Sequence, residues 1–353
     1  MTTPFQLVLL VFLIAPIAVV AEASSAGVNR MMALDRNDDG VLTEDESPPG
    51  MFSLLDTNDD GVIVRSEVAE FMAKVGRPFS WVNAPESARA HPRRSHSTFL
   101  SPTMKVSVGF NIYLPPGYEQ PENSNKRYPV IYYLHGGRPG NESLTIDLVA
   151  EIDTAVTTGV VRPMIFVWAN GGRVSHYNYG DSLGEDVFVK ELIPHIDRTY
   201  RTIATRGGRA LQGFSQGGRG TTRIMFKYPE LFVSAAPGSP GYAVEKLILE
   251  SGGVEQDPRV GANAPALDFG KGNDAYSLAK TYLNGRYDDL AVMIWVGTKD
   301  FNYAATLEYF GYLYALDISA ERLIAPDVDH NPLKFYNAHG VKLLQFHDRH
   351  WRF

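Results

Sequence analysis

The sequence predicts an α/β protein, in which a small all-α acidic module precedes a large zone with a mostly parallel central sheet. Two observations support this prediction. From about residue 96 to residue 353, short apolar runs alternate with segments of helical periodicity, which is typical of a parallel sheet covered by helices. Residues 28–75 are instead acidic and helical in pattern. A chain of 353 residues can hold one large domain and one small one.

The elements of the large zone can be placed in order. The segment 105–113 alternates polar and apolar residues and ends before two prolines, as expected of an antiparallel strand. Continuous apolar runs, typical of strands buried on both faces, occur at residues 128–134, 163–168 and 290–296. Helical spacing marks residues 143–157 and 186–200.

Two further segments have their own composition. Residues 1–23 contain an uncharged apolar run, Leu7 to Val20, followed by Ala21-Glu22-Ala23, which resembles a secretory signal peptide cleaved after Ala23. The run is shorter than the roughly 20 apolar residues of a membrane-spanning helix, although an uncleaved anchor is the alternative. We therefore expect a secreted or periplasmic protein. Residues 76–95 contain three prolines and a basic pair, and we interpret them as a linker.

Charge and cysteine content exclude several classes of protein. The net charge is −7, and residues 31–73 alone carry 11 acidic and 2 basic residues, a charge of −9. The rest is close to neutral, so the chain lacks the basic face of a nucleic-acid-binding protein. There are no cysteines, which excludes disulfides, thiolate catalysis and cysteine-ligated zinc. The acidic stretch points to a cation site.

Two twelve-residue segments, 35–46 and 56–67, fit the calcium loop of an EF-hand. Calcium takes six to eight hard oxygens on a flexible loop that turns sharply at a glycine in position 6, and both segments have glycine there. In the first segment, the predicted ligands are Asp35, Asn37, Asp39, the Val41 carbonyl, Thr43 and Glu46. In the second segment, they are Asp56, Asn58, Asp60, the Val62 carbonyl and Glu67. The predicted cofactor is therefore Ca²⁺ in a structural role.

The second loop and the spacing depart from a standard pair. Position 9 of the second loop is Val64, whose side chain has no oxygen, so we expect a water there and weaker binding. Only residues 47–55 separate the loops, and Pro48-Pro49 interrupts them, so two full helices do not fit. Dockerin modules are similarly short, but their loops usually end in Asp rather than Glu. We expect a compact calcium-stabilised appendage; a docking role, or a solvated acidic loop that binds nothing, are the alternatives.

The pentapeptide Gly213-Phe214-Ser215-Gln216-Gly217 has the pattern G-x-S-x-G. It lies between the end of a buried strand, 209–212, and a helical segment, 218–228. A serine on such a sharp strand-to-helix turn needs glycine two residues away on each side, because larger side chains would collide there. The turn presents the hydroxyl at the N-terminus of the helix. The pattern predicts that Ser215 is a nucleophile.

A serine nucleophile needs a base, and the base needs an orienting carboxylate. In the α/β-hydrolase fold these follow in the order Ser, acid, His. Asp300 follows the late strand, and His330 lies in a polar loop thirty residues further on. Ser215, Asp300 and His330 are therefore the predicted triad. A helix-capping role is the alternative for Asp300. The other eight histidines compete with His330; His135 fits a turn, His195 a structural position, and His176 a loop that could line the cleft.

The oxyanion of a tetrahedral intermediate needs hydrogen-bond donors. One predicted donor is the backbone N–H of Gln216, directly after the nucleophile. The other is the N–H of Gly137, in the sequence His135-Gly136-Gly137 after an early strand. A mere tight turn at the two glycines is the alternative.

These residues resemble the Putative esterase family of α/β-hydrolases, over residues 97–353. That family includes feruloyl and acetylxylan esterases of carbohydrate esterase family 1, S-formylglutathione hydrolase, enterochelin esterases and mycolyltransferases. The matching segments are Leu114-Pro115-Pro116-Gly117-Tyr118, residues 128–137, residues 191–197, residues 213–218 and Asp329-His330-Asn331. The resemblance implies an ester hydrolase with the triad and oxyanion hole named above. Arg138-Pro139 departs from the glycine-rich run common in the family at this point.

The expected function is that of a secreted serine esterase acting on acyl or feruloyl esters of carbohydrates through an acyl-enzyme. An acyltransferase of the mycolyltransferase type would use the same residues. A calcium-dependent binding or docking protein with an inactive hydrolase domain is the non-enzymatic alternative. The expected partners are an ester substrate, which is a small molecule or a polysaccharide, and calcium. Aromatic side chains that could contact a sugar or phenolic acyl group are Trp168, Tyr177, Tyr179 and Phe301.

Overall fold

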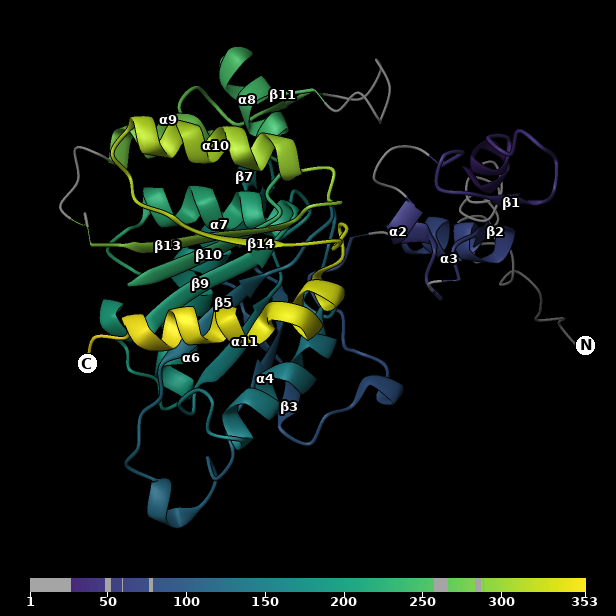
Figure 1. Ribbon diagram of the computed structural model, residues 1–353. Helices are drawn as coiled ribbons and strands as arrows, with labels where there is room; N and C mark the ends of the chain where they lie inside the picture. Colours follow the sequence, from purple (N-terminus) through teal and green to yellow (C-terminus); the bar gives the residue numbers. More distant parts are fainter. Residues whose placement is uncertain are drawn as a thin grey trace, which may run out of the picture. The chain divides into compact units, whose positions relative to one another are not determined.

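The structure is a computed structural model, and it describes residues 27–47, 52–58, 60–75, 79–256, 266–282, 287 and 289–353. The chain divides into two compact units, Met1–Pro78 and Phe79–Phe353, which Figure 1 shows as ribbons. The predicted signal segment, residues 1–23, lies outside the described residues. Within the described ranges, no helix has the length and apolar character needed to cross a membrane.

The larger unit is built on one eight-stranded sheet with the strand order β14-β13-β10-β9-β5-β6-β4-β3. The strands from β14 to β6 are all parallel, whereas β4 is antiparallel to both of its neighbours. The strands are β3 (Arg94–Leu100), β4 (Ser107–Tyr113), β5 (Val130–Leu134), β6 (Ile165–Ala169), β9 (Arg209–Phe214), β10 (Ser234–Gly238), β13 (Ala291–Gly297) and β14 (Glu321–Ala325). The predicted α/β-hydrolase-like fold is confirmed.

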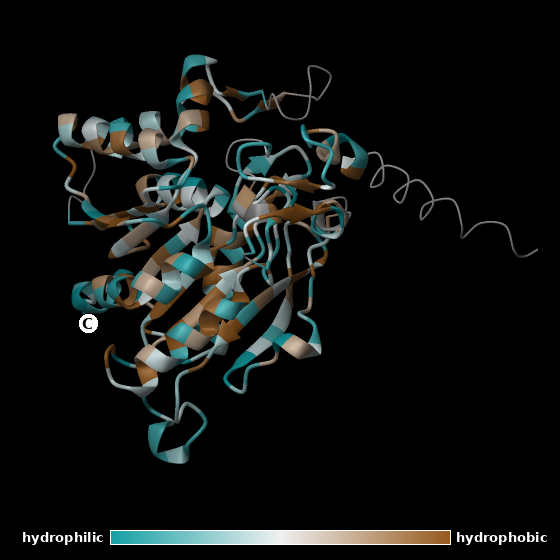
Figure 2. Cartoon of the chain, turned by 45° about the vertical axis from the view of Figure 1, so that its right-hand side comes forward, coloured by the Kyte–Doolittle hydropathy of each residue, from teal (hydrophilic) through white to brown (hydrophobic). Residues whose placement is uncertain are grey.

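Both faces of the sheet are buried. In β5, Val130, Tyr132 and Leu134 join one hydrophobic core, while Ile131 and Tyr133 join the other. Successive side chains of a strand point to opposite faces, so a strand covered on both sides has no polar face. Figure 2 shows this as brown, hydrophobic strands in the centre of the unit. Continuous apolar runs were therefore the correct signal for these strands.

Helices cover the two faces. The first core takes residues from α7, α9, α10 and the helical segment before β9, and the second takes residues from α4 and α11. Figure 1 shows α9 and α10 on one side of the sheet and α11 on the other. The helices are α4 (Val149–Thr157), α5 (Gly184–Asp186), a π-helical turn (Val187–Leu192), α6 (Ile193–Thr199), α7 (Gln216–Lys227), α8 (Tyr242–Glu250), α9 (Ala275–Tyr282), α10 (Tyr303–Ala315) and α11 (Pro332–His350).

Much of the predicted linker, residues 76–95, belongs to the larger unit, which begins at Phe79. The guanidinium of Arg93 donates to both carboxylate oxygens of Asp153 in α4, at 2.6 and 2.5 Å. Arg89 pairs in the same way with Asp147, at 3.1 and 2.6 Å. Bidentate arginine–carboxylate pairs fix orientation as well as distance, so this proline-containing segment packs against the domain rather than spacing it.

The smaller unit has a core formed by Val28, Leu42, Leu55, Ile63 and Val68. Its elements are β1 (Val41–Leu42), α2 (Phe52–Leu55), β2 (Ile63–Val64) and α3 (Arg65–Val75), with a further helical turn at residues 27–32. The unit was predicted to be all-α, but β1 and β2 form a short antiparallel pair. This pair joins the two predicted calcium loops, because β1 lies at positions 7 and 8 of the first loop and β2 lies at positions 8 and 9 of the second.

Candidate active site

Ser215 lies on a sharp turn between β9 and α7. Its backbone has φ +57° and ψ −114°, a conformation that a non-glycine residue adopts at a cost of roughly 1–3 kcal/mol. A Cβ added to Gly217 would lie 1.9 Å from the Leu134 carbonyl oxygen, and one added to Gly213 would lie 2.5 Å from the carbonyl oxygen of Gly217. Only glycine fits at both positions, so the reason for the G-x-S-x-G pattern is visible in the packing.

Three side chains that are far apart in sequence form one chain of hydrogen bonds. The Nε2 of His330 lies 2.8 Å from the Ser215 Oγ, and its Nδ1 lies 2.8 Å from the Asp300 Oδ2. A carboxylate can only accept, so the network assigns the proton to Nδ1, which donates to Asp300. The unprotonated Nε2 can then accept the hydroxyl proton of Ser215. The predicted trio is thus brought together in the order that general-base chemistry requires.

The parallel sheet explains why these residues meet. Ser215 follows β9, Asp300 follows β13 and His330 follows β14. The carboxyl ends of parallel strands lie at the same edge of the sheet, where α/β proteins place their binding sites. The Asn331 side chain accepts from the N–H groups of Leu333 and Lys334 at the start of α11, so the loop that carries His330 is fixed by a helix cap.

Aromatic rings enclose the imidazole of His330. The ring of Phe214 lies 4.6 Å from it and the ring of Phe301 lies 4.2 Å from it, centroid to centroid. Phe214 is buried, but Phe301 is 49% exposed. An apolar side chain therefore reaches solvent directly beside His330.

The loop after β5 lies against the nucleophile. A Cβ on Gly136 would lie 3.4 Å from the Ser215 Cβ, and Gly137 has φ +77°, which favours glycine. The N–H of Gln216 has no partner within its helix, because Gln216 is the first residue of α7. The predicted donor Gln216 thus directly follows Ser215, and the predicted donor Gly137 follows the glycine that lies against Ser215.

Two buried histidines support this loop. The Nδ1 of His135 donates to the Gly136 carbonyl at 3.0 Å, and its Nε2 accepts from the N–H of Gly171 at 3.0 Å. Burial lowers the pKa of His135 to about 4, so the imidazole is neutral and both bonds have a fixed direction. His176 donates to the His135 carbonyl from Nε2 at 2.9 Å. His135 shapes the turn, as its sequence context indicated, and His176 stabilises it through the bond to the His135 carbonyl.

Behind the loop and α7 lies a buried network of charges that the sequence did not reveal. Arg219 donates to Glu245 at 2.6 Å and to Glu255 at 2.9 Å, and Arg138 donates to Glu255 at 2.8 Å. Burial acts to raise the pKa of Glu255, but the charges of Arg219 and Arg138 outweigh it and lower this pKa to about 2. Arg219 also bonds the Gln216 side chain at 3.0 Å. The network joins the segment after Gly137 to the helix of Ser215.

The aromatic candidates separate clearly. Trp168 is buried within β6, and the buried Tyr177 donates its hydroxyl to Glu245 at 2.7 Å. Tyr179 lies in β7 (Asn178–Tyr179), half-buried. Only Phe301 of the four lies in contact with a member of the Ser215 trio, and it is exposed. The buried Trp168 and Tyr177 therefore have structural positions, and Phe301 is the candidate substrate contact.

The two acidic loops of the smaller unit have the same geometry. Asp35 accepts from the N–H groups of Asp38 and Gly40, each at 2.8 Å, and Asp56 accepts from that of Gly61 at 3.1 Å. Position 12 repeats as well, because Glu46 and Glu67 each bond two backbone N–H groups of their own loop.

These hydrogen bonds keep the glutamates ionised. The backbone N–H of Thr43, followed by its hydroxyl, lowers the pKa of Glu46 to about 2. The two glycines at position 6 have φ values of +86° and +88°. In the described ranges, no three or more His, Asp or Glu side chains are grouped closely enough to hold a metal ion. The donor set itself, made of carboxylate, amide and hydroxyl oxygens, is of the hard type that calcium prefers.

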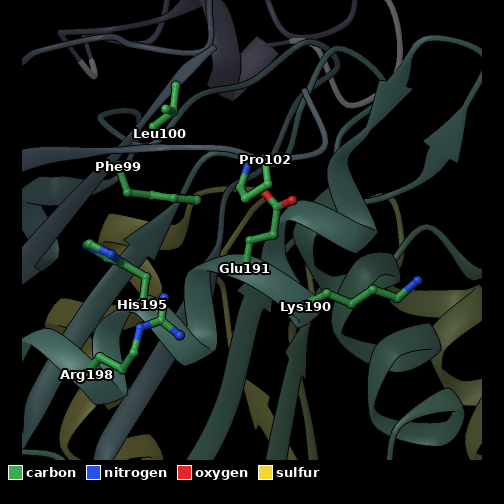
Figure 3. A pocket seen from close by; sticks show the side chains of 7 residues that line it. All are labelled: Phe99, Leu100, Pro102, Lys190, Glu191, His195 and Arg198. Carbon is green, nitrogen blue, oxygen red and sulfur yellow. The ribbon is translucent and has the colours of Figure 1, made fainter. Parts of the chain in front are cut away.

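A pocket of about 400 Å³ lies elsewhere on the larger unit (Figure 3). It is lined by the end of β3 with the following turn and by the helical segment before β9, through Phe99, Leu100, Pro102, Lys190, Glu191, His195 and Arg198. His195 stacks on Phe99 with a centroid distance of 5.1 Å, which agrees with a structural role. None of these residues belongs to the Ser215 trio.

The fold and this constellation define an α/β-hydrolase with a serine at its strand-to-helix turn. Residues 101–310, more than half of the chain, match the family described as "Putative esterase", and the chain belongs to this family. The predicted family is confirmed, which places the chain among carboxylic ester hydrolases.

Several similar proteins carry the name esterase. An esterase of Mycobacterium tuberculosis is 32% identical over 154 residues, which are 42% of this chain and 32% of that protein. A protein of Xylanibacter ruminicola named endo-1,4-beta-xylanase/feruloyl esterase is 33% identical over 152 residues, 40% of this chain and 21% of that one. The match thus spans about a third or less of these curated relatives. A solved ferulic acid esterase shares the fold, with a TM-score of 0.61 and 19% identity over 73% of this chain and 98% of its own.

Proposed function

We propose that this protein is a serine ester hydrolase with Ser215 as nucleophile, His330 as general base and Asp300 as the orienting carboxylate. The single observation that carries the proposal is the pair of 2.8 Å contacts that link Ser215 to His330 and His330 to Asp300. His330 takes the Ser215 proton as the hydroxyl attacks the ester carbonyl, and returns it to the leaving alcohol. Water then hydrolyses the acyl-enzyme by the reverse path.

The negative oxygen of each tetrahedral intermediate is stabilised by the N–H groups of Gly137 and Gln216. Loss of one such donor typically costs roughly 2.7–4 kcal/mol of transition-state stabilisation. Support comes from the positions of the two segments: the loop with Gly136 and Gly137 lies against the Ser215 turn, and Gln216 is the first residue of α7. The partly buried ion pair of Arg138 with Glu255, which also binds Arg219, links both segments before substrate binds.

The proposed substrate class is acyl or feruloyl esters of carbohydrates. Two observations support it: a relative is named a xylanase/feruloyl esterase, and Phe301 offers an exposed ring beside His330. A phenolic acyl group can stack on such a ring, with aromatic pairs worth about 0.5–1.5 kcal/mol beyond area burial.

A panel of p-nitrophenyl acetate, methyl ferulate and acetylated xylan tests the proposal. Hydrolysis of at least one ester is expected, and the Ser215→Ala variant should lose it. Full turnover by the Ser215→Ala variant would show that Ser215 is not the nucleophile. In Phe301→Leu, KM for methyl ferulate should rise several-fold while that for acetylated xylan, which has no aromatic ring, stays near wild type. Products formed with a sugar acceptor present separate hydrolysis from acyl transfer, because an acyltransferase would yield the acylated sugar.

For the smaller unit, we propose that both loops bind Ca²⁺. The ligands in the first loop would be Asp35, Asn37, Asp39, the Val41 carbonyl, Thr43 and Glu46, and the equivalents in the second would be Asp56, Asn58, Asp60, the Val62 carbonyl and Glu67. The support is the repeated loop geometry with glycine at position 6. Bound calcium would compensate the negative charge of the loops and stabilise the smaller unit.

Calorimetric titration of the full chain with calcium chloride tests this. Asp35→Ala combined with Asp56→Ala should abolish the heat of binding. Glu44→Gln is the matched control, because Glu44 is an acidic residue of the first loop that is not among the proposed ligands. Absence of heat with the unaltered chain would contradict the proposal.

Residues 1–23 are proposed to direct export, and N-terminal sequencing of exported protein that starts at Met1 would contradict cleavage.

A further inference from the structure

A second buried serine lies at the Asp300–His330 pair. Ser239 directly follows β10 and is fully buried. Its φ is +38°, in the left-handed region that a non-glycine residue occupies only when its surroundings enforce it. Its N–H donates to the Trp295 carbonyl in β13 at 2.7 Å. This strained backbone aims the hydroxyl at the carboxylate beyond the neighbouring strand.

The hydroxyl makes a triangle with the two partners. The Ser239 Oγ lies 2.5 Å from the Asp300 Oδ2 and 2.9 Å from the His330 Nδ1, which itself lies 2.8 Å from the same Oδ2. The carboxylate cannot donate, so the hydroxyl proton of Ser239 points to Asp300. The lone pairs of Ser239 then face the imidazole N–H, which can share its proton between the two oxygens.

The remaining oxygen of Asp300 is also held. Its Oδ1 accepts from the N–H of Asn302 at 2.8 Å, and the Asn302 side chain donates to the Ser239 carbonyl at 2.9 Å. The carboxylate therefore receives three donors from Ser239, Asn302 and His330, all in a buried site. With both oxygens bonded, the carboxyl plane cannot rotate away from the imidazole.

We propose that Ser239 is a positioning residue whose hydroxyl holds the Asp300 carboxylate, and through it the His330 imidazole, in the orientation that accepts the Ser215 proton. This rests on the proposed esterase function. No additional proton is transferred: the Ser215 proton moves to Nε2 and back, while the Nδ1 proton and the Ser239 proton stay on their own atoms. The positive charge that forms on His330 is stabilised by a carboxylate that stays fixed.

The same strand offers a matched control. Ser234, the first residue of β10, is also fully buried, and its Oγ lies 2.8 Å from the Nδ1 of His347 in α11. It is another serine hydroxyl bonded to a buried histidine, but no member of the Ser215 trio takes part. If Ser239 only fills space and satisfies a histidine, Ser239→Ala and Ser234→Ala should have similar effects.

The test compares kinetics on the ester that the wild-type protein hydrolyses. Ser239→Ala should lower kcat roughly ten- to a hundredfold with KM within about twofold, the range for loss of one hydrogen bond to a charged group. Ser234→Ala should retain kcat within about twofold. Ser239→Gly gives a second variant without the hydroxyl, because glycine accepts the positive φ and so preserves the fold if alanine does not.

A double-mutant cycle separates positioning from general loss of stability. If Ser239 acts through Asp300, its removal should add little to the loss already caused by Asp300→Asn. The proton NMR signal of the imidazole N–H that faces the carboxylate should also move in Ser239→Gly and stay in place in Ser234→Ala. Both Ser239 variants turning over within twofold of wild type, or losses that add in full, would overturn the inference. Turnover that survives Ser215→Ala would instead overturn the proposed function.

Discussion

The two units collect their polar side chains in opposite ways. In the smaller unit, each loop takes all of its candidate ligands from twelve consecutive residues, and the loop geometry repeats from one loop to the other. In the larger unit, Ser215, Asp300 and His330 come from the ends of three strands, and the serine and the histidine are 115 positions apart in the sequence. A local site can be recognised from its sequence alone. A non-local site depends on the sheet that brings its parts together.

The largest effect is expected at Asp300, which lies close to His330 in space but not in sequence. Asp300→Asn should lower kcat by roughly 10⁴-fold, because the asparagine amide favours the wrong imidazole tautomer. Asp329, the residue next to His330, is the control, since its carboxylate pairs with Lys334 rather than with the imidazole. Asp329→Asn should keep kcat within a few-fold of wild type. Steady-state kinetics of both variants decide, and equal losses would contradict the spatial assignment.

The buried charge network of the larger unit should matter for stability more than any surface pair. Glu245→Gln leaves Arg219 without its 2.6 Å partner in a buried site, and should lower the free energy of unfolding by about 3–5 kcal/mol. Glu308→Gln removes an exposed pair with Lys246 and should change little. Denaturant unfolding measures the free energy of unfolding of both variants. Similar losses would show that burial does not determine how much an ion pair stabilises the unit.

The loop that carries Gly137 should make the larger unit sensitive to acid. The folded-state pKa of His135 is about 4, below the value of about 6.5 expected in the unfolded chain. The unfolded state therefore binds more protons between these values. The contribution of His135 to the free energy of unfolding is fully present above about pH 6.5 and is lost as the pH falls towards 4.

That loss corresponds to about 3 kcal/mol for this one histidine. Unfolding measured between pH 7 and 4 should show the decline, and His135→Asn should reduce its slope. A slope that His135→Asn leaves unchanged would assign the decline to other groups.

The smallest effect concerns backbone geometry in the two units. Gly61 has φ +88° in the second acidic loop, so Gly61→Ala should destabilise the smaller unit by about 1 kcal/mol and weaken calcium uptake. Gly311 lies within α10 with open space around its Cα, so Gly311→Ala should stabilise the larger unit by about 0.5–1 kcal/mol. Thermal unfolding of both variants tests the pair, and shifts of the same sign would contradict the local reading of Gly61.

Elements whose sequence carried one clear signal were predictable. The runs that form β5, β6 and β13 are apolar throughout, because both faces of those strands are covered, and the turn at Ser215 has a pattern set by steric clash. β10 gave no such signal, since Ser234–Gly238 contains Pro237 and two alanines, and its strand character comes from pairing with β9 and β13.

The missed strand explains the missed residue. Ser239 acquires its place only from the end of β10 and from the strained φ that its neighbours enforce, neither of which a single sequence displays. The network of Arg138, Arg219, Glu245 and Glu255 was hidden for the same reason, because its members pair across more than 25 residues of chain. Most of the predicted linker, from Phe79 onward, belongs to the larger unit. Arg89 and Arg93 pair with carboxylates in and beside α4, and the proline content of a segment does not reveal such ion pairs.

His330 is delivered by β14, the outermost strand of the sheet, whose single strand neighbour is β13. An edge strand can open locally at a smaller free-energy cost than the whole domain needs to unfold. Detachment of β14 would withdraw His330, the proposed base, while Ser215 and its turn stay intact. Inactivation on warming can therefore precede melting of the sheet and reverse on cooling.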